Sequence, residues 1–142
     1  MNYQFVCKVT YTEQTEAGIL KRATKSYLVH EPTFSAAEES IYKHLSEVIR
    51  GEFVINGIAR ADFAEIFVED QEFSDFFEVK ARFEIIDEDS AKAKKKTFTY
   101  LVTAESTKHA IAYIESVLSG ENPDMTVPAA KESPIVDVFE PM

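Results

Sequence analysis

The sequence predicts an α+β fold with two internally duplicated β-β-α-β-β halves, antiparallel sheets, two helices and pseudo-two-fold symmetry. The tripeptide Tyr27–Val29 (YLV) recurs at Tyr100–Val102, 73 residues later. Apolar residues alternate before each copy, as in strands, and follow helical spacing after it. Self-similarity of this kind is the sequence signature of an internal repeat.

The match between the halves covers almost the whole chain. Matching pairs at offsets of 72 or 73 residues are Phe5 and Phe77, Ala37 and Ala110, Ile41 and Ile114, Leu45 and Leu118, and Phe67 and Phe139. One half alone is too small to bury a good core. We therefore expect residues 1–142 to form one domain of two intertwined repeats, at about residues 3–70 and 75–141.

Each half is expected to begin with a hairpin. Its first strand has apolar side chains at alternate positions, and a polar turn ("EQTEAG" or "DEDSAK") leads into a second strand that contains the repeated tripeptide. The alternating residues are Phe5, Cys7, Val9 and Tyr11 in the first half, and Val79, Ala81 and Phe83 in the second.

A helix is expected after each hairpin. Thr33 and Ser106 occupy matching N-cap positions, although Ser35–Glu38 forms a competing capping box. Gly51 and Gly120 follow the predicted helices, where a left-handed residue commonly ends a helix. The apolar positions with helical spacing are Ala37, Ile41, Leu45, Val48 and Ile49, and then Ala110, Ile114, Val117 and Leu118.

Short strands are expected after each helix: "EFVINGIAR" and "AEIFVE" in the first half, "MTVPA" and "PIVDVF" in the second. Pro128 should lie on an edge strand, where its missing N–H is tolerated. The segment Ile135–Phe139 is either a strand equivalent to Phe63–Phe67 or a flexible tail that recruits a partner. Its four apolar residues favour the strand, because burying a large side chain contributes about 1.5–3 kcal/mol. Ile135, Asp137 and Phe139 should then share one face of the strand, with Val136 and Val138 on the other.

Composition limits the class of protein. The chain has 45% hydrophobic residues and no apolar run of about 18 residues, and we expect no secretory signal. The single cysteine excludes an internal disulfide and a multi-cysteine zinc site. We expect a cytoplasmic protein that does not associate with membranes.

The sequence shows no catalytic motif. Its four glycines cannot form a phosphate-binding GxGxxG or P-loop, and neither a GxSxG nor an HExxH motif is present. His44 and His109 are expected on partly exposed helix positions, and Cys7 in the core. Asp87–Ser90 lacks the Gly and Glu of a calcium loop and is expected to be a hairpin turn. We therefore expect no catalytic residue, no metal site, no cofactor and no enzymatic activity.

Charge is unevenly distributed along the chain. The net charge of −10 argues against coating of duplex DNA by bulk attraction, but both predicted hairpins have a run of basic residues without an acid. Aromatic residues flank both runs, and single-stranded nucleic acid binds where bases stack on rings and cations follow phosphates. The candidate residues for single-stranded DNA or RNA are Lys21, Arg22, Lys25, Tyr27, Lys92, Lys94, Lys95, Lys96, Phe98 and Tyr100.

Other interpretations remain open. Lysines often protect strand edges from aggregation, and strand aromatics usually belong to the core. Recurrence of the basic run is no independent support for binding, because duplication copies either role. The acidic balance and the apolar C-terminus favour a second function class, a protein–protein interaction module. The sequence does not indicate an oligomeric state.

The chain also resembles an uncharacterised domain family of gut Bacteroidetes and their phages, including crAss-like phages. The matching residues are Tyr27-Leu28-Val29, the helix from Phe34 to Ile49, Arg50-Gly51-Glu52-Phe53, Phe63 to Phe67, and Pro134 to Phe139. The resemblance implies a phage or mobile-element setting inside a bacterial host cell and brings no activity. In that setting the protein–protein module would inhibit a host factor or belong to a virion or its assembly. The predicted topology is similar to that of duplicated Pur-type and whirly-type single-strand binders, an analogy of fold alone.

Overall fold

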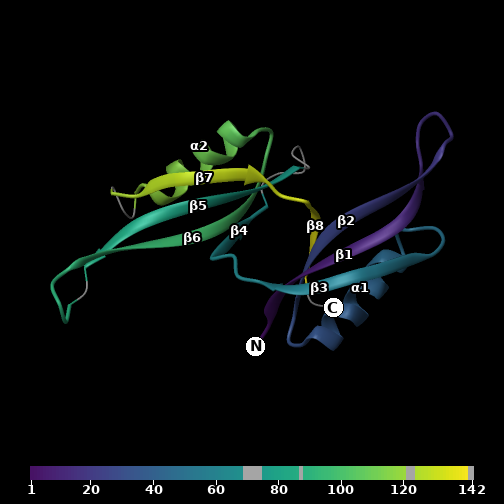
Figure 1. Cartoon of the computed structure of the whole chain (residues 1–142), viewed down its shortest axis with the longest axis horizontal. Coiled ribbons are helices and arrows are strands. Elements are labelled where there is room, and N and C mark those ends of the chain that lie inside the picture. Colours follow the sequence, from purple (N-terminus) through teal and green to yellow (C-terminus); the bar gives the residue numbers. More distant parts are fainter. Residues whose placement is uncertain (69–74, 87, 121–123, 141–142) are drawn as a thin grey trace. The chain divides into compact units, whose positions relative to one another are not determined.

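The computed structural model describes residues 1–68, 75–86, 88–120 and 124–140, and it confirms the α+β class. Within these residues eight strands form two four-stranded sheets, and two helices complete the fold (Figure 1). The chain divides into two compact units. Unit 1 comprises Met1–Asp62 and Pro134–Met142, and unit 2 comprises Phe63–Ser133.

Each half has the predicted order β-β-α-β-β. The first half contains β1 (Tyr3–Gln14), β2 (Leu20–Glu31), α1 (Phe34–Ser46), β3 (Phe53–Ala61) and β4 (Glu65–Phe67). The second half contains β5 (Asp75–Ile86), β6 (Ala93–Ala104), α2 (Thr107–Leu118), β7 (Thr126–Glu132) and β8 (Ile135–Phe139).

The last strand of each half pairs in the sheet of the other half. The sheet orders are β3-β1-β2-β8 in unit 1 and β4-β6-β5-β7 in unit 2. β8 runs parallel to β2 and β4 runs parallel to β6, whereas the other pairs are antiparallel. The sheets are therefore mainly antiparallel, with one parallel pair each. A parallel pair needs a long connection, and a strand supplied by the other repeat satisfies this requirement.

The exchange is equivalent in the two halves. In β4, Phe67 pairs with Val102 of β6, and in β8, Phe139 pairs with Val29 of β2. These partners match at the offsets of 72 and 73 residues found in the sequence. The predicted two-fold rotation between the halves remains a prediction.

A β-bulge recurs at matching positions. The register between β1 and β3 shifts between Lys8 and Val9, which leaves Asn56 unpaired. The register between β5 and β7 shifts at the equivalent place, beside Pro128. β7 is an edge strand, as predicted, and a bulge on an edge strand tolerates a residue without an N–H.

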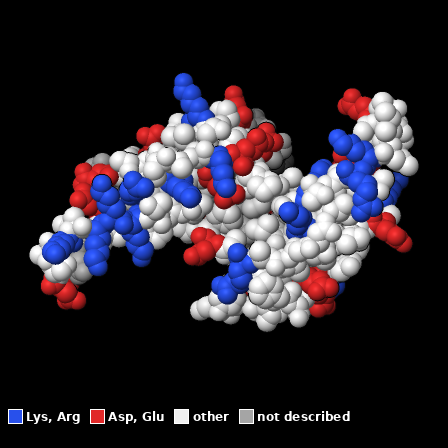
Figure 2. Space-filling view, in the orientation of Figure 1, with Lys and Arg blue, Asp and Glu red and all other residues white. Residues whose placement is uncertain are grey.

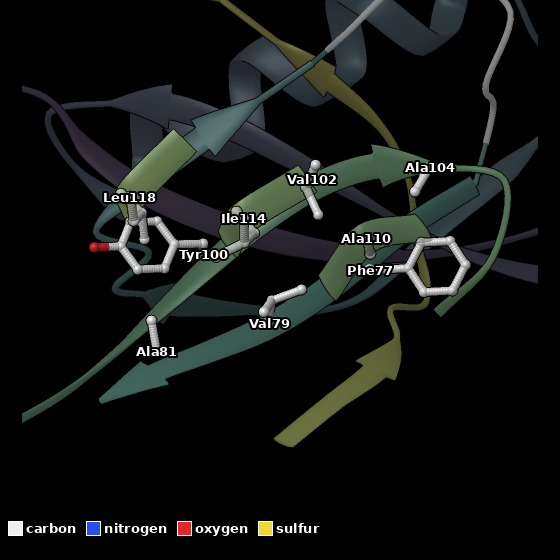
Figure 3. Packing of buried hydrophobic residues seen from close by; sticks show 9 residues of the cluster. All are labelled: Phe77, Val79, Ala81, Tyr100, Val102, Ala104, Ala110, Ile114 and Leu118. Carbon is white, nitrogen blue, oxygen red and sulfur yellow. The ribbon is translucent and has the colours of Figure 1, made fainter. Parts of the chain in front are cut away.

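Each unit has a core between one sheet face and one helix. Figure 3 shows this arrangement in unit 2, where Ile114 of α2 lies over Val79 and Val102 of the sheet. In unit 1, Ile41 of α1 packs in the same way on Cys7 and Val29. The apolar alternation of the first strands and the helical spacing of Ala, Ile and Leu therefore produce the predicted cores.

The helix starts are confirmed and the helix ends are corrected. The Thr33 hydroxyl accepts a hydrogen bond from the N–H of Ala36, and Ser106 caps α2 in the same way. α1 ends at Ser46, so Val48, predicted on the helix, lies in the exposed segment that follows. Gly120 has no left-handed φ, because the cap residue Ser119 bonds back to Glu115 and continues the right-handed turn.

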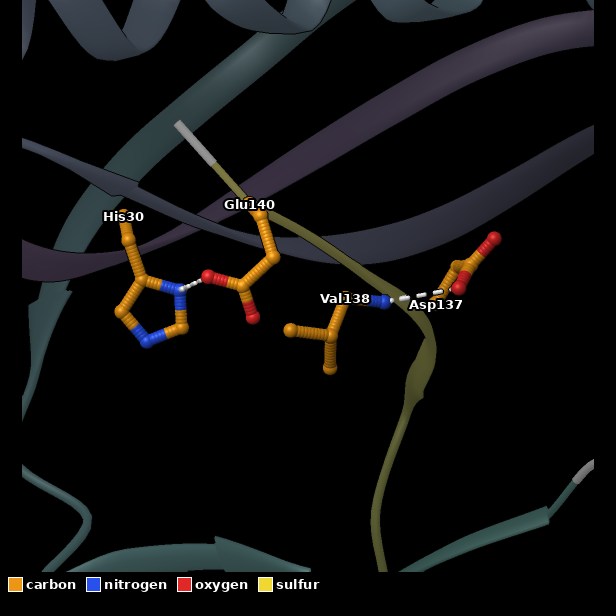
Figure 4. A network of polar contacts seen from close by, with 4 residues as sticks. All are labelled: His30, Asp137, Val138 and Glu140. Atoms are coloured by element: carbon orange, nitrogen blue, oxygen red, sulfur yellow. Dashed lines mark hydrogen bonds and ion pairs between the residues drawn. The ribbon is translucent and has the colours of Figure 1, made fainter. Parts of the chain in front are cut away.

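Strand β8 confirms that the C-terminal segment is structured. The Phe139 ring lies between two other rings, with centroid distances of 5.6 Å to Tyr27 and 4.3 Å to His44. Beside it, Glu140 Oε2 is 4.0 Å from His30 Nδ1 (Figure 4).

The predicted alternation along β8 is wrong at one position. Ile135 pairs with Ser26, but the register shifts before Asp137, which pairs with Tyr27. Asp137 and Phe139 therefore share the face of Tyr27, and Ile135 lies on the opposite face. An irregularity of one residue is enough to exchange faces, because side chains alternate along a strand.

Candidate nucleic-acid interface

The outer half of each hairpin extends beyond the rest of its sheet (Figure 1). β8 pairs with residues 26–29 of β2, and β4 pairs with residues 100–102 of β6, so the outer half of each of these strands has one neighbouring strand. Basic side chains gather over these outer halves, with acidic ones near the hairpin ends (Figure 2).

In unit 1 the basic residues are divided between the two faces of the hairpin. Lys21 and Lys25 lie on the helix side, opposite Glu13 and Val9 of β1, whereas Arg22 lies on the other side. Glu13 Oε2 is 3.6 Å from the Lys25 ammonium, so this acid neutralises part of the basic run.

A lysine also covers an aromatic ring in unit 1. The Lys25 ammonium is 5.7 Å from the centroid of the partly exposed Tyr11 ring. A hydrogen bond with Tyr11, together with the nearby Glu13 carboxylate, raises the pKa of Lys25. This lysine therefore keeps its positive charge next to the Tyr11 ring.

Unit 2 also has a lysine over a partly exposed ring, although these two residues are not the repeat equivalents of Lys25 and Tyr11. Lys94 and Lys96 lie on the helix side of β6 with Phe98, and Lys95 lies on the other side, opposite Glu84. The Lys96 ammonium is 5.3 Å from the centroid of the partly exposed Phe98 ring. Phe98 also packs edge-to-face on Phe83, with centroids 5.8 Å apart.

Two candidates do not belong to this surface. Tyr27 and Tyr100 are only 8% and 7% exposed, and both rings lie in the hydrophobic cores. A base cannot stack on them in this fold. Their two-residue spacing from Val29 and Val102 places them on the core face, a signal that was available in the sequence. Lys92 is exposed and lies in the short segment between the turn at residues 88–90 and β6.

Protection of strand edges also fits the positions of the lysines. Lys94, Lys95 and Lys96 lie where β6 pairs with β5 alone, so one edge of β6 is open there. Charged side chains at an open edge disfavour pairing with another chain. The lysine–ring contacts go beyond this role, because edge protection does not require a ring beneath the cation.

Cys7, His44 and His109 have structural contacts. Burial raises the pKa of the Cys7 thiol to about 11, which disfavours a reactive thiolate. The His44 ring stacks on Phe139, and His109 Nδ1 accepts a hydrogen bond from the N–H of Glu105. Among the described residues, no group of His, Cys, Asp and Glu could hold a metal ion. Asp87 lies outside the described residues, and residues 88–90 form a turn.

Neither α1 nor α2, the helices of the described residues, has the length and apolar character needed to span a bilayer.

Comparison with known proteins shows the family. No curated protein matches the chain. A family model described as a domain of unknown function, DUF4494, matches residues 3–142. The predicted membership of an uncharacterised domain family is thus confirmed: this chain belongs to the DUF4494 family.

Proposed function

We propose that this protein is a non-enzymatic accessory protein of a phage or mobile element that binds single-stranded DNA or RNA in the bacterial cytoplasm. The observation that carries the proposal is a lysine ammonium above a partly exposed ring in each hairpin, Lys25 over Tyr11 and Lys96 over Phe98. The phage or mobile-element setting is proposed from the resemblance noted in the sequence.

The physical chemistry of single strands supports this choice. Stacking of one base on an aromatic side chain contributes about 1–3 kcal/mol, and neighbouring cations bind the phosphates on either side. Unit 2 is better equipped than unit 1, because Lys94 and Lys96 lie on the same face of the hairpin as two rings, Phe83 and Phe98. The net charge of −10 restricts binding to such local patches.

The test is charge reversal of the unit 2 hairpin. Replacing Lys94, Lys95 and Lys96 with Glu should abolish most binding of single-stranded oligonucleotides, measured by fluorescence anisotropy at about 50 mM salt. Wild-type affinity should fall steeply as the salt concentration rises, because binding releases counterions. Circular dichroism should stay native, since these side chains are exposed.

A control with the same change in net charge separates local from global effects. Lys43, Lys108 and Lys131 are exposed on α1, α2 and β7, and their replacement with Glu should leave most of the binding intact. Equal losses in the two triple variants would mean that the hairpin has no special role. No wild-type binding at low salt would refute the proposal.

Exposed aliphatic side chains favour the second candidate, a protein–protein interaction module. Ile19 and Leu20 at the end of the first hairpin are 64% and 73% exposed, and Ile86 at the end of the second is 71% exposed. Exposed apolar groups beside acidic turns fit a protein surface better than a phosphate backbone. If oligonucleotide binding fails, a host-factor inhibitor or a virion or assembly component becomes the better proposal.

A further inference from the structure

The same surface hollow recurs in the two units. The unit 1 hollow has a volume of about 310 Å³ and is lined by residues of β1, β2 and the segment entering β3. The unit 2 hollow has a volume of about 160 Å³ and is lined by the matching parts of β5, β6 and the segment entering β7. Matching lining residues are Thr10 and Arg82, Thr12 and Glu84, Arg22 and Lys95, Glu52 and Asp124, and Val54 and Thr126.

The fold brings the polar groups of the unit 1 hollow together. Thr12 and Arg22 are directly opposite each other on β1 and β2. Gly51 has a φ of +102°, a conformation that glycine adopts without strain, and this turn brings the neighbouring Arg50 into the lining. Arg22 and Arg50 are 28 residues apart in the sequence, so only the paired strands reveal that they share a site.

The two hollows differ in charge. The unit 1 hollow contains the guanidiniums of Arg22 and Arg50 and one carboxylate, that of Glu52. Within the described residues, neither guanidinium forms an ion pair. The unit 2 hollow contains two cations, Arg82 and Lys95, and two carboxylates. Only the unit 1 hollow thus has an excess of positive charge.

We propose that the unit 1 hollow binds the phosphate of a nucleotide. Guanidinium groups donate paired hydrogen bonds to phosphate oxygens, and two of them around one hollow bind a dianion or a phosphodiester. The Thr12 hydroxyl supplies a further donor at the same place. When the protein binds single-stranded DNA or RNA, this nucleotide is one nucleotide of the bound strand. The inference therefore rests on the proposed function and adds a defined phosphate position to it.

The size and charge of the hollow select the ligand. A volume of about 310 Å³ exceeds what a bare phosphate fills and leaves space for the attached sugar. The unit 2 hollow has half the volume and Glu84 where unit 1 has Thr12. A carboxylate at that place repels a phosphate, so the second hollow serves as an internal negative control.

The test uses the full chain and three ligands: inorganic phosphate, a nucleoside 5′-monophosphate and a short single-stranded oligonucleotide. In ¹⁵N-resolved NMR spectra, the nucleotide should shift the amide signals of Thr12 and Gly51. The double substitution Arg22→Gln and Arg50→Gln should remove these shifts and weaken oligonucleotide binding at least about tenfold, because each charged hydrogen bond is strong. Arg82→Gln in the unit 2 hollow should leave the nucleotide-dependent shifts of Thr12 and Gly51 unchanged.

The outcomes separate this inference from the proposed function. Oligonucleotide binding that is lost in the Lys94, Lys95 and Lys96 variant but intact in the double arginine variant would overturn the hollow and keep the proposed function. Nucleotide-dependent shifts without any oligonucleotide binding would keep the hollow and overturn the proposed function. Equal binding of inorganic phosphate and the nucleotide would overturn the assignment of a nucleotide. Native circular dichroism of the double variant shows that a loss is not due to unfolding.

Discussion

Gly18 and Ala91 occupy the same position in the two repeats, and both have a positive φ, +81° and 55°. Glycine adopts this conformation freely, whereas a residue with a Cβ is disfavoured there by about 1–2 kcal/mol. A Cβ on Gly18 would meet Gln14 Nε2 at 3.8 Å, an ordinary contact. The backbone conformation, and not a clash, therefore decides the effect of substitution in both turns.

We expect opposite effects from exchanging these two residues. Ala91→Gly should raise the free energy of unfolding by about 0.5–1 kcal/mol, and Gly18→Ala should lower it by about 1 kcal/mol, as measured by urea denaturation. Gly120, which lacks a positive φ, is the control, and Gly120→Ala should not destabilise the protein. A loss of stability in Ala91→Gly would contradict the turn conformation.

Cys7 gives the stability of the fold a pH dependence at alkaline pH. Burial raises the pKa of its thiol from 9.0 to about 11, so the unfolded chain loses this proton more readily. The contribution to stability is full below about pH 9 and is lost as the pH rises through about 11. Between these values the free energy of unfolding should fall on the order of 1–3 kcal/mol more in the wild type than in Cys7→Ala. The prediction would be refuted if urea denaturation showed that the free energy of unfolding falls equally in the two proteins across this pH range.

At the scale of single elements, β8 shows how much a short strand contributes. It places Ile135 in a buried position and Phe139 on the core of unit 1. Truncation after Ser133 leaves β7 whole and removes these contacts, which should lower the melting temperature on the order of 10 °C. Truncation after Glu140 retains β8 and should leave the melting temperature unchanged. If both truncated proteins melt like the full chain, β8 does not stabilise unit 1.

The helices and their caps follow from local signals. Thr33 and Ser106 cap the helices because each side chain accepts a hydrogen bond three residues ahead, and their positions match in the repeat. The C-terminal ends of the helices were less predictable from the sequence. Ile49 has helical spacing from Leu45 and its N–H bonds to the Leu45 carbonyl, yet the helix ends at Ser46. Apolar spacing therefore predicted the contact between Ile49 and Leu45 correctly, but it overestimated the length of α1.

At the scale of the whole molecule, the two repeats are not the two compact units. β4 lies in the first repeat but pairs in unit 2, and β8 lies in the second repeat but completes unit 1. Neither repeat can form a four-stranded sheet from its own strands in this arrangement. The expectation of a single domain remains a prediction, and the exchanged strands give it a physical basis, because each sheet requires both repeats.

The sequence by itself determined the element order, the repeat, the helix starts and the cores, because these depend on periodicity and on residues close together in the chain. It also showed the basic runs that become the hairpin surfaces. The tertiary structure alone decided that β4 and β8 exchange places and that Arg22 and Arg50 line one hollow. Those features depend on which distant strands pair and in which register, and a shift of one residue reverses the face of every side chain that follows.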